Sequence, residues 1–344
     1  MSVRPVHLGL AALLVATSAA AQGTRYTVAG RDVAIYNLAG ILRVEPGTGG
    51  SVVVEVTRHG ADASRLDVQT GTIEGRETLR VIYPDDRIVY EPLGRHSRTQ
   101  ISVREDGTFN GHGGRHVTIS GDGSGLEASA DLRVLVPEGQ RITVNLAVGH
   151  VAVTNVNAQL MVDASSADVE ASGTRGSLSV DVGSGDVQVS RAEGNLSVDT
   201  GSGNVTLSDV KAEDVGIDTG SGDVAATTLG ARSLKIDTGS GGVKLSGVAT
   251  ENADLDTGSG DIEIDVDASL KSFHAETGSG NVTLRAPASL SASLDIETSS
   301  GEIDSDFDVA VTRREDDHLV GRIGSGAGRI SVDTGSGDVR LVRR

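Results

Sequence analysis

A tetrapeptide found in the active-site loops of aspartic proteases, D-T-G-S, occurs five times in this 344-residue chain. The full copies begin at Asp199, Asp218, Asp237, Asp256 and Asp333. Aspartic proteases bring two such loops face to face, so that two carboxylates share one proton. Here the copies recur at the spacing of a structural repeat, which predicts a ladder of Asp side chains instead of a facing pair. We therefore interpret D-T-G-S as a structural motif.

Two other patterns could bind metal ions. The Gly-Asp pairs resemble the Ca²⁺-binding β-roll, but that motif repeats every nine residues as G-G-x-G-x-D, about half the period seen here. Ca²⁺ binding thus stays possible, without assigned ligands. His112 and His116 stand close together in H-G-G-R-H. With no carboxylate at helical spacing, we interpret this segment as an exposed loop and predict no metal-binding residues.

Carbohydrate chemistry is the remaining enzymatic alternative, because pectate-lyase-like proteins share a repetitive β fold. Those enzymes line a groove with aromatic side chains, bases and metal-binding acids. The repeat region offers only Phe273 and Phe307 as aromatics and few basic residues. We predict a non-enzymatic protein with no catalytic and no cofactor-binding residues, and keep a polysaccharide lyase-like enzyme as an alternative.

The repeat itself is a unit close to D-T-G-S-G-D, preceded by a degenerate copy at Asp163. Successive units start 18 to 21 residues apart as far as Glu297. The last step, to Asp333, is 36 residues. It leaves room for an insertion around residues 309–321 and for a further coil at residues 323–326. Fixed-period self-similarity of this kind is typical of solenoids.

Each repeat contains two segments in which apolar and polar residues alternate, such as Leu234/Ile236 before the turn and Val243/Leu245 after it. Alternation at period two indicates a half-buried strand. Gly-Ser-Gly between the strands is suited to a sharp corner with positive φ. The pattern predicts an all-β fold, a parallel β-solenoid (β-helix) of about 18–21-residue coils, in which stacked coils share one core.

Two columns of polar residues flank the corner. The residue before it is always acidic, whereas the residue after it alternates between charged and neutral. Stacked coils lie about 4.8 Å apart, where two carboxylates repel by roughly 1 kcal/mol in water. We expect the alternation to reduce this repulsion. For the acidic column we favour hydrogen bonds to the turn backbone over bound cations. The post-turn residues are Asp186, Asn204, Asp223, Gly242, Asp261, Asn281 and Glu302.

The N-terminus predicts export. Arg4, an apolar run over residues 8–16 and Ala19-Ala20-Ala21 form the three parts of a secretory signal peptide. The run is too short to span a bilayer, so we expect cleavage after Ala21 and a periplasmic, cell-surface or secreted protein. No later segment predicts a transmembrane span. The chain has no Cys, so it cannot form disulfides.

Three segments follow from these patterns: a signal peptide (1–21), an N-terminal β-rich region that caps the solenoid (22–140), and the solenoid (141–344). In the second segment, strand-like stretches alternate with Gly-rich turns but lack the strict repeat. Residues 83–114 contain Pro84 and Pro92 and several charges. We expect them to form a mobile or inserted loop.

Charge limits the partners. The formal net charge is −18, and residues 145–308 alone hold 27 Asp and Glu against 8 Lys and Arg. Such a surface disfavours nucleic acid and anionic lipid. It leaves an unknown protein or glycan as the partner. An open strand edge at the end of the solenoid would also invite self-association.

The recurrent T-G-S-G-D-[VI]-x-[LV] units, together with the closing segment 324–338, resemble the bacterial "putative adhesin" domain family of exported β-strand-repeat proteins. The resemblance covers roughly residues 30–344. It implies a solenoid and an adhesin-like surface or envelope role, and brings no catalytic or ligand residues with it. A periplasmic sensor or partner-binding module remains the main alternative.

Overall fold

The computed structural model of the chain describes residues 23–111, 113–268 and 270–344. The predicted signal peptide, residues 1–21, and His112 lie outside these ranges. The described chain is almost entirely β-strand, with two short 3₁₀ segments, η1 (Ala63–Arg65) and η2 (Glu91–Leu93). Within these ranges, no helix is long and apolar enough to cross a membrane.

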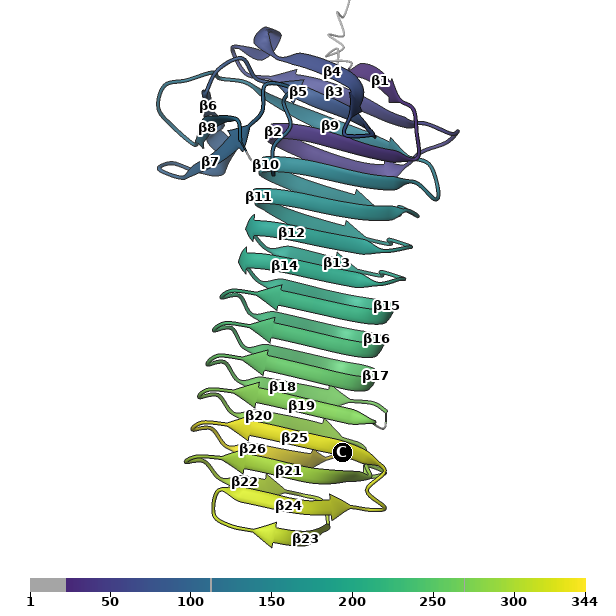
Figure 1. Cartoon of the computed structure of the whole chain (residues 1–344), viewed down its shortest axis with the longest axis vertical. Coiled ribbons are helices and arrows are strands. Elements are labelled where there is room, and N and C mark those ends of the chain that lie inside the picture. The colour runs from purple at the N-terminus through teal and green to yellow at the C-terminus, as the bar shows by residue number, and fades with distance from the viewer. Residues whose placement is uncertain (1–22, 112, 269) are drawn as a thin grey trace, which may run out of the picture.

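Parallel strands stacked along one axis form the long body of the molecule (Figure 1). Ile217, Ile236 and Leu255 stand opposite one another on successive strands and are buried. The alternating apolar residues thus fill one continuous core, as the period-two pattern predicts. The predicted all-β, parallel, solenoid-like fold is confirmed. The strands of this part are β10 (Arg141–Thr154), β11 (Gln159–Ser172), β12 (Leu178–Ser184), β13 (Val187–Ser190), β14 (Leu196–Ser202), β15 (Val205–Thr219), β16 (Val224–Thr238), β17 (Val243–Thr257), β18 (Ile262–Val266), β19 (Ser272–Thr277) and β20 (Val282–Ala286).

The last repeat of the sequence is not the last coil in space. Strand β25 (Gly328–Thr334) pairs in parallel with both β19 and β21 (Ala292–Thr298). Strand β26 (Val339–Arg343) likewise pairs with both β20 and β22 (Ile303–Ser305). The chain therefore passes over one coil position and returns to fill it. Figure 1 shows β25 and β26, in yellow, between greener strands that come earlier in the chain.

An antiparallel hairpin ends the stack. Strand β24 (His318–Ile323) pairs with β21, and β23 (Val309–Arg314) pairs with β24. The prediction of a further coil at residues 323–326 is wrong, because Ile323 ends β24 and the residues after it form the turn to β25. The stack thus ends in β23 on one side and in the short β22, which pairs with β26, on the other; the C-terminal strand β26 is interior. A register irregularity between Val311 and Arg313 interrupts the pairing of β23.

The corner glycines have a different role from the expected one. Among the described D-x-G-S-G corners, positive φ occurs only at Gly185 and Gly203. In the regular corners the constraint is steric instead: a Cβ on Gly241 would overlap the carbonyl oxygen of Gly222 in the preceding coil. Glycine is required because the coils touch backbone to backbone at the corner.

At the N-terminal end, strand β2 (Asp32–Pro46) continues the parallel stack by pairing with β10 from Asp32↔Arg141 to Val44↔Val153. Strand β5 (Arg76–Ile82) covers the first half of β2, and β9 (Ser129–Val136) covers the second half. Antiparallel partners follow on each side. They are β4 (Asp67–Ile73) beside β5, β3 (Val52–His59) beside β9, and β1 (Thr24–Val28) beside β3.

A separate three-stranded sheet projects beside this end (Figure 1), where the sequence suggested a loop. We call it the side sheet; it consists of β6 (Arg87–Val89), β7 (Arg98–Val103) and β8 (Arg115–Ser120). The buried hydroxyl of Tyr83 donates to Oδ1 of Asn37 on β2 at 2.9 Å. Burial raises the pKa of Tyr83 far above its usual value, so the phenol stays a neutral anchor.

Candidate functional site

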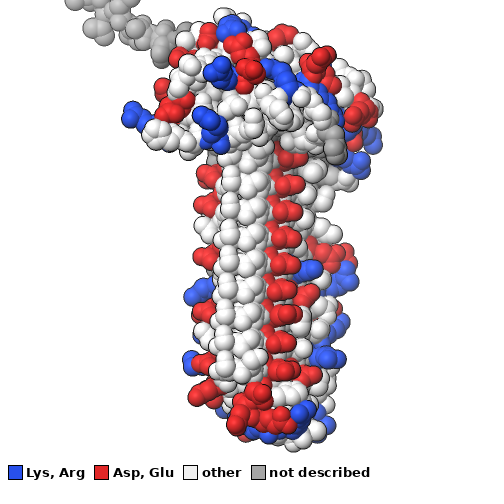
Figure 2. Space-filling model, turned by 60° about the vertical axis from the view of Figure 1, so that its left-hand side comes forward, with Lys and Arg blue, Asp and Glu red and all other residues white. Residues whose placement is uncertain are grey.

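A continuous column of carboxylates runs down one face of the solenoid (Figure 2). These residues precede the corner, and strand alternation directs them outward while the following Thr points into the core. Almost all of them are exposed. In spatial order the acidic column consists of Asp163, Asp181, Asp199, Asp218, Asp237, Asp256, Glu276, Asp333 and Glu297.

Protein cations do little to neutralise the acidic column. Within the described ranges, one ion pair reaches it, between His274 and Glu276 at 3.9 Å. Burial and the neighbouring Asp181 carboxylate raise the pKa of Asp163 to about 6. Burial and the charges of the adjacent Asp237 and Asp199 also raise the pKa of Asp218. The stacked carboxylates therefore repel one another in the folded chain.

The threonine of D-T-G-S, not the aspartate, makes the hydrogen bonds of the corner. Thr238 Oγ1 accepts a bond from the N–H of Gly241 at 3.1 Å. The same hydroxyl donates to the carbonyl of Gly222 in the preceding coil at 3.1 Å. The equivalent Thr side chains are all buried. Our expectation that the acidic residue before the corner bonds to the turn backbone is thus wrong, because that side chain points outward.

The predicted turn interaction occurs instead in the post-turn column, and it joins neighbouring coils. The N–H of Asn204 donates to Oδ1 of Asp186 at 2.8 Å, and the N–H of Asp223 donates to Oδ1 of Asn204 at 3.1 Å. Asn204 Nδ2 also donates to Oδ1 of Asp186 at 3.3 Å. An Asn between two Asp residues therefore has two roles. Its side-chain oxygen accepts the backbone N–H of the next coil, and its side-chain NH₂ donates to the carboxylate of the preceding coil.

The structure gives the Thr of D-T-G-S a place in the corner and its Asp a place on the outer face. Adjacent Asp side chains of the column stand side by side on neighbouring parallel strands, as with Asp218 and Asp237. They share one outer face and do not oppose each other across a cleft. The sequence prediction of a ladder agrees with this arrangement.

His116, the described member of the H-G-G-R-H pair, lies exposed on β8, 3.4 Å from Ser102 Oγ. The predicted loop is therefore partly a strand. Within residues 23–111, 113–268 and 270–344, no three His, Asp or Glu side chains are grouped so that they could hold a metal ion.

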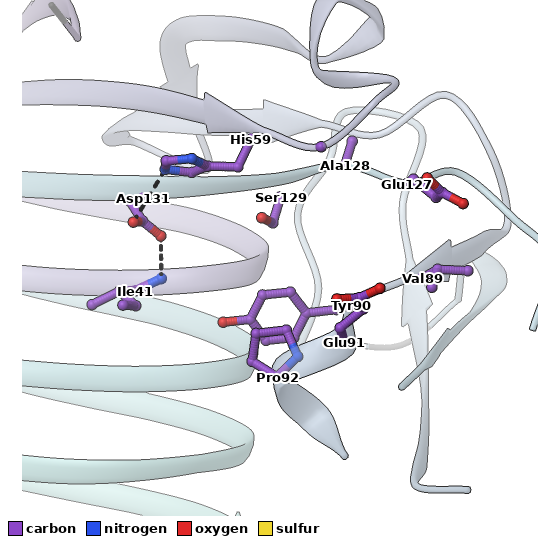
Figure 3. A pocket seen from close by; sticks show the side chains of 11 residues that line it. Ile41, His59, Val89, Tyr90, Glu91, Pro92, Glu127, Ala128, Ser129 and Asp131 are labelled. Atoms are coloured by element: carbon purple, nitrogen blue, oxygen red, sulfur yellow. Dashed lines mark hydrogen bonds and ion pairs between the residues drawn. The ribbon is translucent and has the colours of Figure 1, made fainter. Parts of the chain in front are cut away.

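Two adjoining hollows lie where the side sheet meets the parallel stack. The first, of about 440 Å³, is drawn in Figure 3, and the second measures about 510 Å³. Both are lined by Ile41, Tyr90 and Pro92. We call the two hollows together the groove. Its second hollow continues onto the corners of the first coils, where it is lined by His150 and Asp168.

Asp131 on β9 organises the first hollow. Its Oδ1 accepts the backbone N–H of Ile41 at 2.9 Å, and its Oδ2 lies 3.2 Å from Nε2 of His59. Ser129 stands opposite His59 on the neighbouring strand. The hydroxyl of Tyr90 points toward the side of the hollow where Ile41 and Asp131 lie (Figure 3). Burial and the Asp131 charge raise the pKa of Tyr90 above its usual value.

Sequence reasoning missed the groove. Ile41, His59, Tyr90 and Asp131 are widely spaced in the chain and belong to no motif. They come together only because β3, β9 and β2 pair and the side sheet folds against them. In the sequence, the strict repeat gives way to irregular strands before residue 141, and this change is the one feature that marks the region of the groove.

These features define an all-β solenoid with an acidic outer column and a groove at its N-terminal end. A family model described as Toastrack DUF4097 matches residues 103–342, which is more than half of the chain. The chain belongs to the Toastrack DUF4097 family, and this confirms the adhesin-like family resemblance drawn from the T-G-S-G-D units. No curated protein matches the chain.

Among solved structures, one described as a "putative cell adhesion protein" from Clostridium sporogenes is similar at 9% identity. The match covers 94% of this chain and 99% of that chain, with a TM-score of 0.21. At such a score the two chains do not superpose as wholes, so it adds no evidence about fold or function.

Proposed function

We propose that the chain is a non-enzymatic, exported scaffold with an adhesin-like role at the cell surface or envelope. One observation carries this proposal: the corner threonines and the post-turn residues of the repeat make hydrogen bonds that hold the coils together. Thr238 and its equivalents from Thr219 onward bond within and between corners, whereas the buried hydroxyl of Thr200 has no partner among the described residues. Asp186 and its equivalents bond to the next coil. A stack held together in this way is rigid, and it can hold a binding surface away from its point of attachment.

In this proposal, residues 1–21 direct export and are removed after Ala21, and residues 22–140 cap the N-terminal end of the solenoid. Fractionation of cells that express the tagged chain tests the location. A surface-exposed pool, cleaved by protease added to intact cells, supports the adhesin-like role. Failure of the exposed protein to bind any cell or matrix surface removes that role and leaves the scaffold.

The groove favours a second candidate function, a periplasmic sensor or partner-binding module. Both hollows are lined by Tyr90, whose side chain is largely buried and whose hydroxyl makes no hydrogen bond within the described part of the chain. A soluble periplasmic pool, with no protein reachable from outside the cell, favours this role.

The absence of enzymatic activity in both proposals is tested with a panel of polysaccharides, with and without Ca²⁺. Turnover of any of them contradicts a non-enzymatic protein of either kind.

A further inference from the structure

Tyr90 presents an unused polar group to the groove. Its side chain is only 8% exposed, yet within the described part of the chain its hydroxyl has no hydrogen-bond partner. Tyr83, the other buried tyrosine nearby, satisfies its hydroxyl on Asn37. The hydroxyl is not sealed inside the protein but opens onto the first hollow, where a ligand can reach it. The groove therefore contains an open hydrogen-bonding position that a ligand could occupy.

The charge of the groove selects the sign of that ligand. Four carboxylates line it, against two histidines, and none of its lining residues is Lys or Arg. Concave sites lined by one sign of charge concentrate the field and attract the opposite charge. An anionic ligand would be repelled. The charged residues are Glu91, Glu127, Asp131 and Asp168, with His59 and His150.

The remaining walls favour an organic cation over a metal ion. Ile41, Val89 and Pro92 supply apolar surface beside the Tyr90 ring. An Arg or Lys side chain matches such a site, because its aliphatic stem packs on apolar surface while its head meets carboxylates. An aromatic face near the cation adds further attraction. By contrast, the described acidic and His side chains form no group that could hold a metal.

We propose that the groove binds an extended segment of a partner protein through an Arg or Lys side chain, inserted between Tyr90 and the carboxylates of the first hollow. The segment continues through the second hollow toward Asp168. There the post-turn column begins, since the N–H of Asp186 bonds to Asp168 Oδ1 at 3.0 Å. The proposal rests on the partner-binding role above and holds whether the partner is periplasmic or on another cell.

Fluorescence anisotropy with labelled tri-arginine, tri-lysine and tri-glutamate peptides, on the purified mature chain, tests this site. We expect the two basic peptides to bind and tri-glutamate not to bind. Tyr90→Phe keeps the ring and removes the hydroxyl, and should weaken tri-arginine binding up to about tenfold. Glu127→Gln, at an exposed position, should weaken it as well without affecting folding. Unchanged affinity in both variants overturns the proposal.

A matched control separates the groove from the acidic column. The triple variant Asp237→Asn, Asp256→Asn, Glu276→Gln removes three column charges several coils beyond the groove. It should leave tri-arginine affinity within about twofold at physiological ionic strength, where charges beyond about 8 Å are screened. Loss of binding in this variant places the peptide on the column and overturns the groove proposal. Tyr90-dependent binding of a neutral oligosaccharide, with no peptide binding, also overturns it. Because these assays use purified protein, they are independent of where fractionation places the chain.

Discussion

The backbone N–H of Asp338 donates a hydrogen bond to Oδ1 of Asn281 at 2.9 Å, although 57 residues separate the two in the chain. On the other side, the N–H of Glu302 donates to Oδ1 of Asp338 at 3.0 Å. The last repeat of the sequence is thus an interior coil, bonded to a neighbour on each face. Its loss should affect the stack differently from the loss of a terminal coil.

Removing residues 328–344 should destabilise the chain more than removing one regular coil. The truncation leaves β19 and β21 without the strand between them. Deleting residues 224–242 instead joins Asp223 to Val243, and the flanking coils can then stack directly in the same register. We expect the internal deletion to melt cooperatively near the wild type and the truncation to melt lower and aggregate. Equal melting temperatures would contradict the interior position of the last coil.

The corner glycines should tolerate no side chain. Gly241→Ala drives a Cβ into the carbonyl oxygen of Gly222, so we expect a loss of about 1–3 kcal/mol in the free energy of unfolding, as for overpacked sites. Gly216→Ala is the matched control, because a Cβ there meets nothing within 4 Å. Chemical denaturation measures both. Similar stability of the two variants would refute a steric role for the corner glycines.

The hydroxyl groups of the buried corner threonines should contribute to the stability of the fold through their hydrogen bonds. Thr238→Val keeps the shape but leaves the N–H of Gly241 and the carbonyl of Gly222 without their partner. Unsatisfied buried groups cost about 1–3 kcal/mol. Thr206→Val, at an exposed position on β15, should change stability by less than about 0.5 kcal/mol. An equal effect at both positions would show that the corner bonds contribute nothing.

Asp163 should make stability depend on pH. Its pKa is raised to about 6 in the folded chain, from 3.8, so between these values the folded state binds more protons than the unfolded state. Stability should therefore fall as pH rises from about 4 to 6. Asp163→Asn should weaken this dependence and stabilise the chain at pH 7 by about 1–2 kcal/mol. The more exposed Asp199→Asn is the control, with a smaller expected gain. A stability loss in Asp163→Asn at pH 7 would contradict repulsion in the column.

The end strand β23 should limit self-association. Within the described strands it pairs with β24 alone, and it carries Arg313 and Arg314 at a register irregularity. Charges and irregular pairing are common protections of an edge strand. Replacing both residues by Thr should increase concentration-dependent light scattering, while Arg329→Thr on the interior strand β25 should not. Scattering that is unchanged in the double variant would place any association elsewhere.

Local residue pattern was enough to predict the parallel stack. The alternation of Leu234 and Ile236 around polar neighbours and the recurrence of Gly-Ser-Gly each report on one coil and its copy. Because every coil repeats the same contacts, one repeat contains the information for its neighbours. The outward position of the Asp in D-T-G-S follows from the same alternation, although its hydrogen bonding does not.

Tertiary structure alone decided the rest. In the chain, the repeat of Glu302 follows that of Asn281, but in the stack the coil of Asp338 lies between them. Nearly identical repeats can stack in more than one order. The groove joins Ile41, His59, Tyr90 and Asp131, which no local pattern connects. The D-T-G-S repeat thus determined the coil by itself, whereas the order of the coils and the binding surface depend on contacts between distant segments.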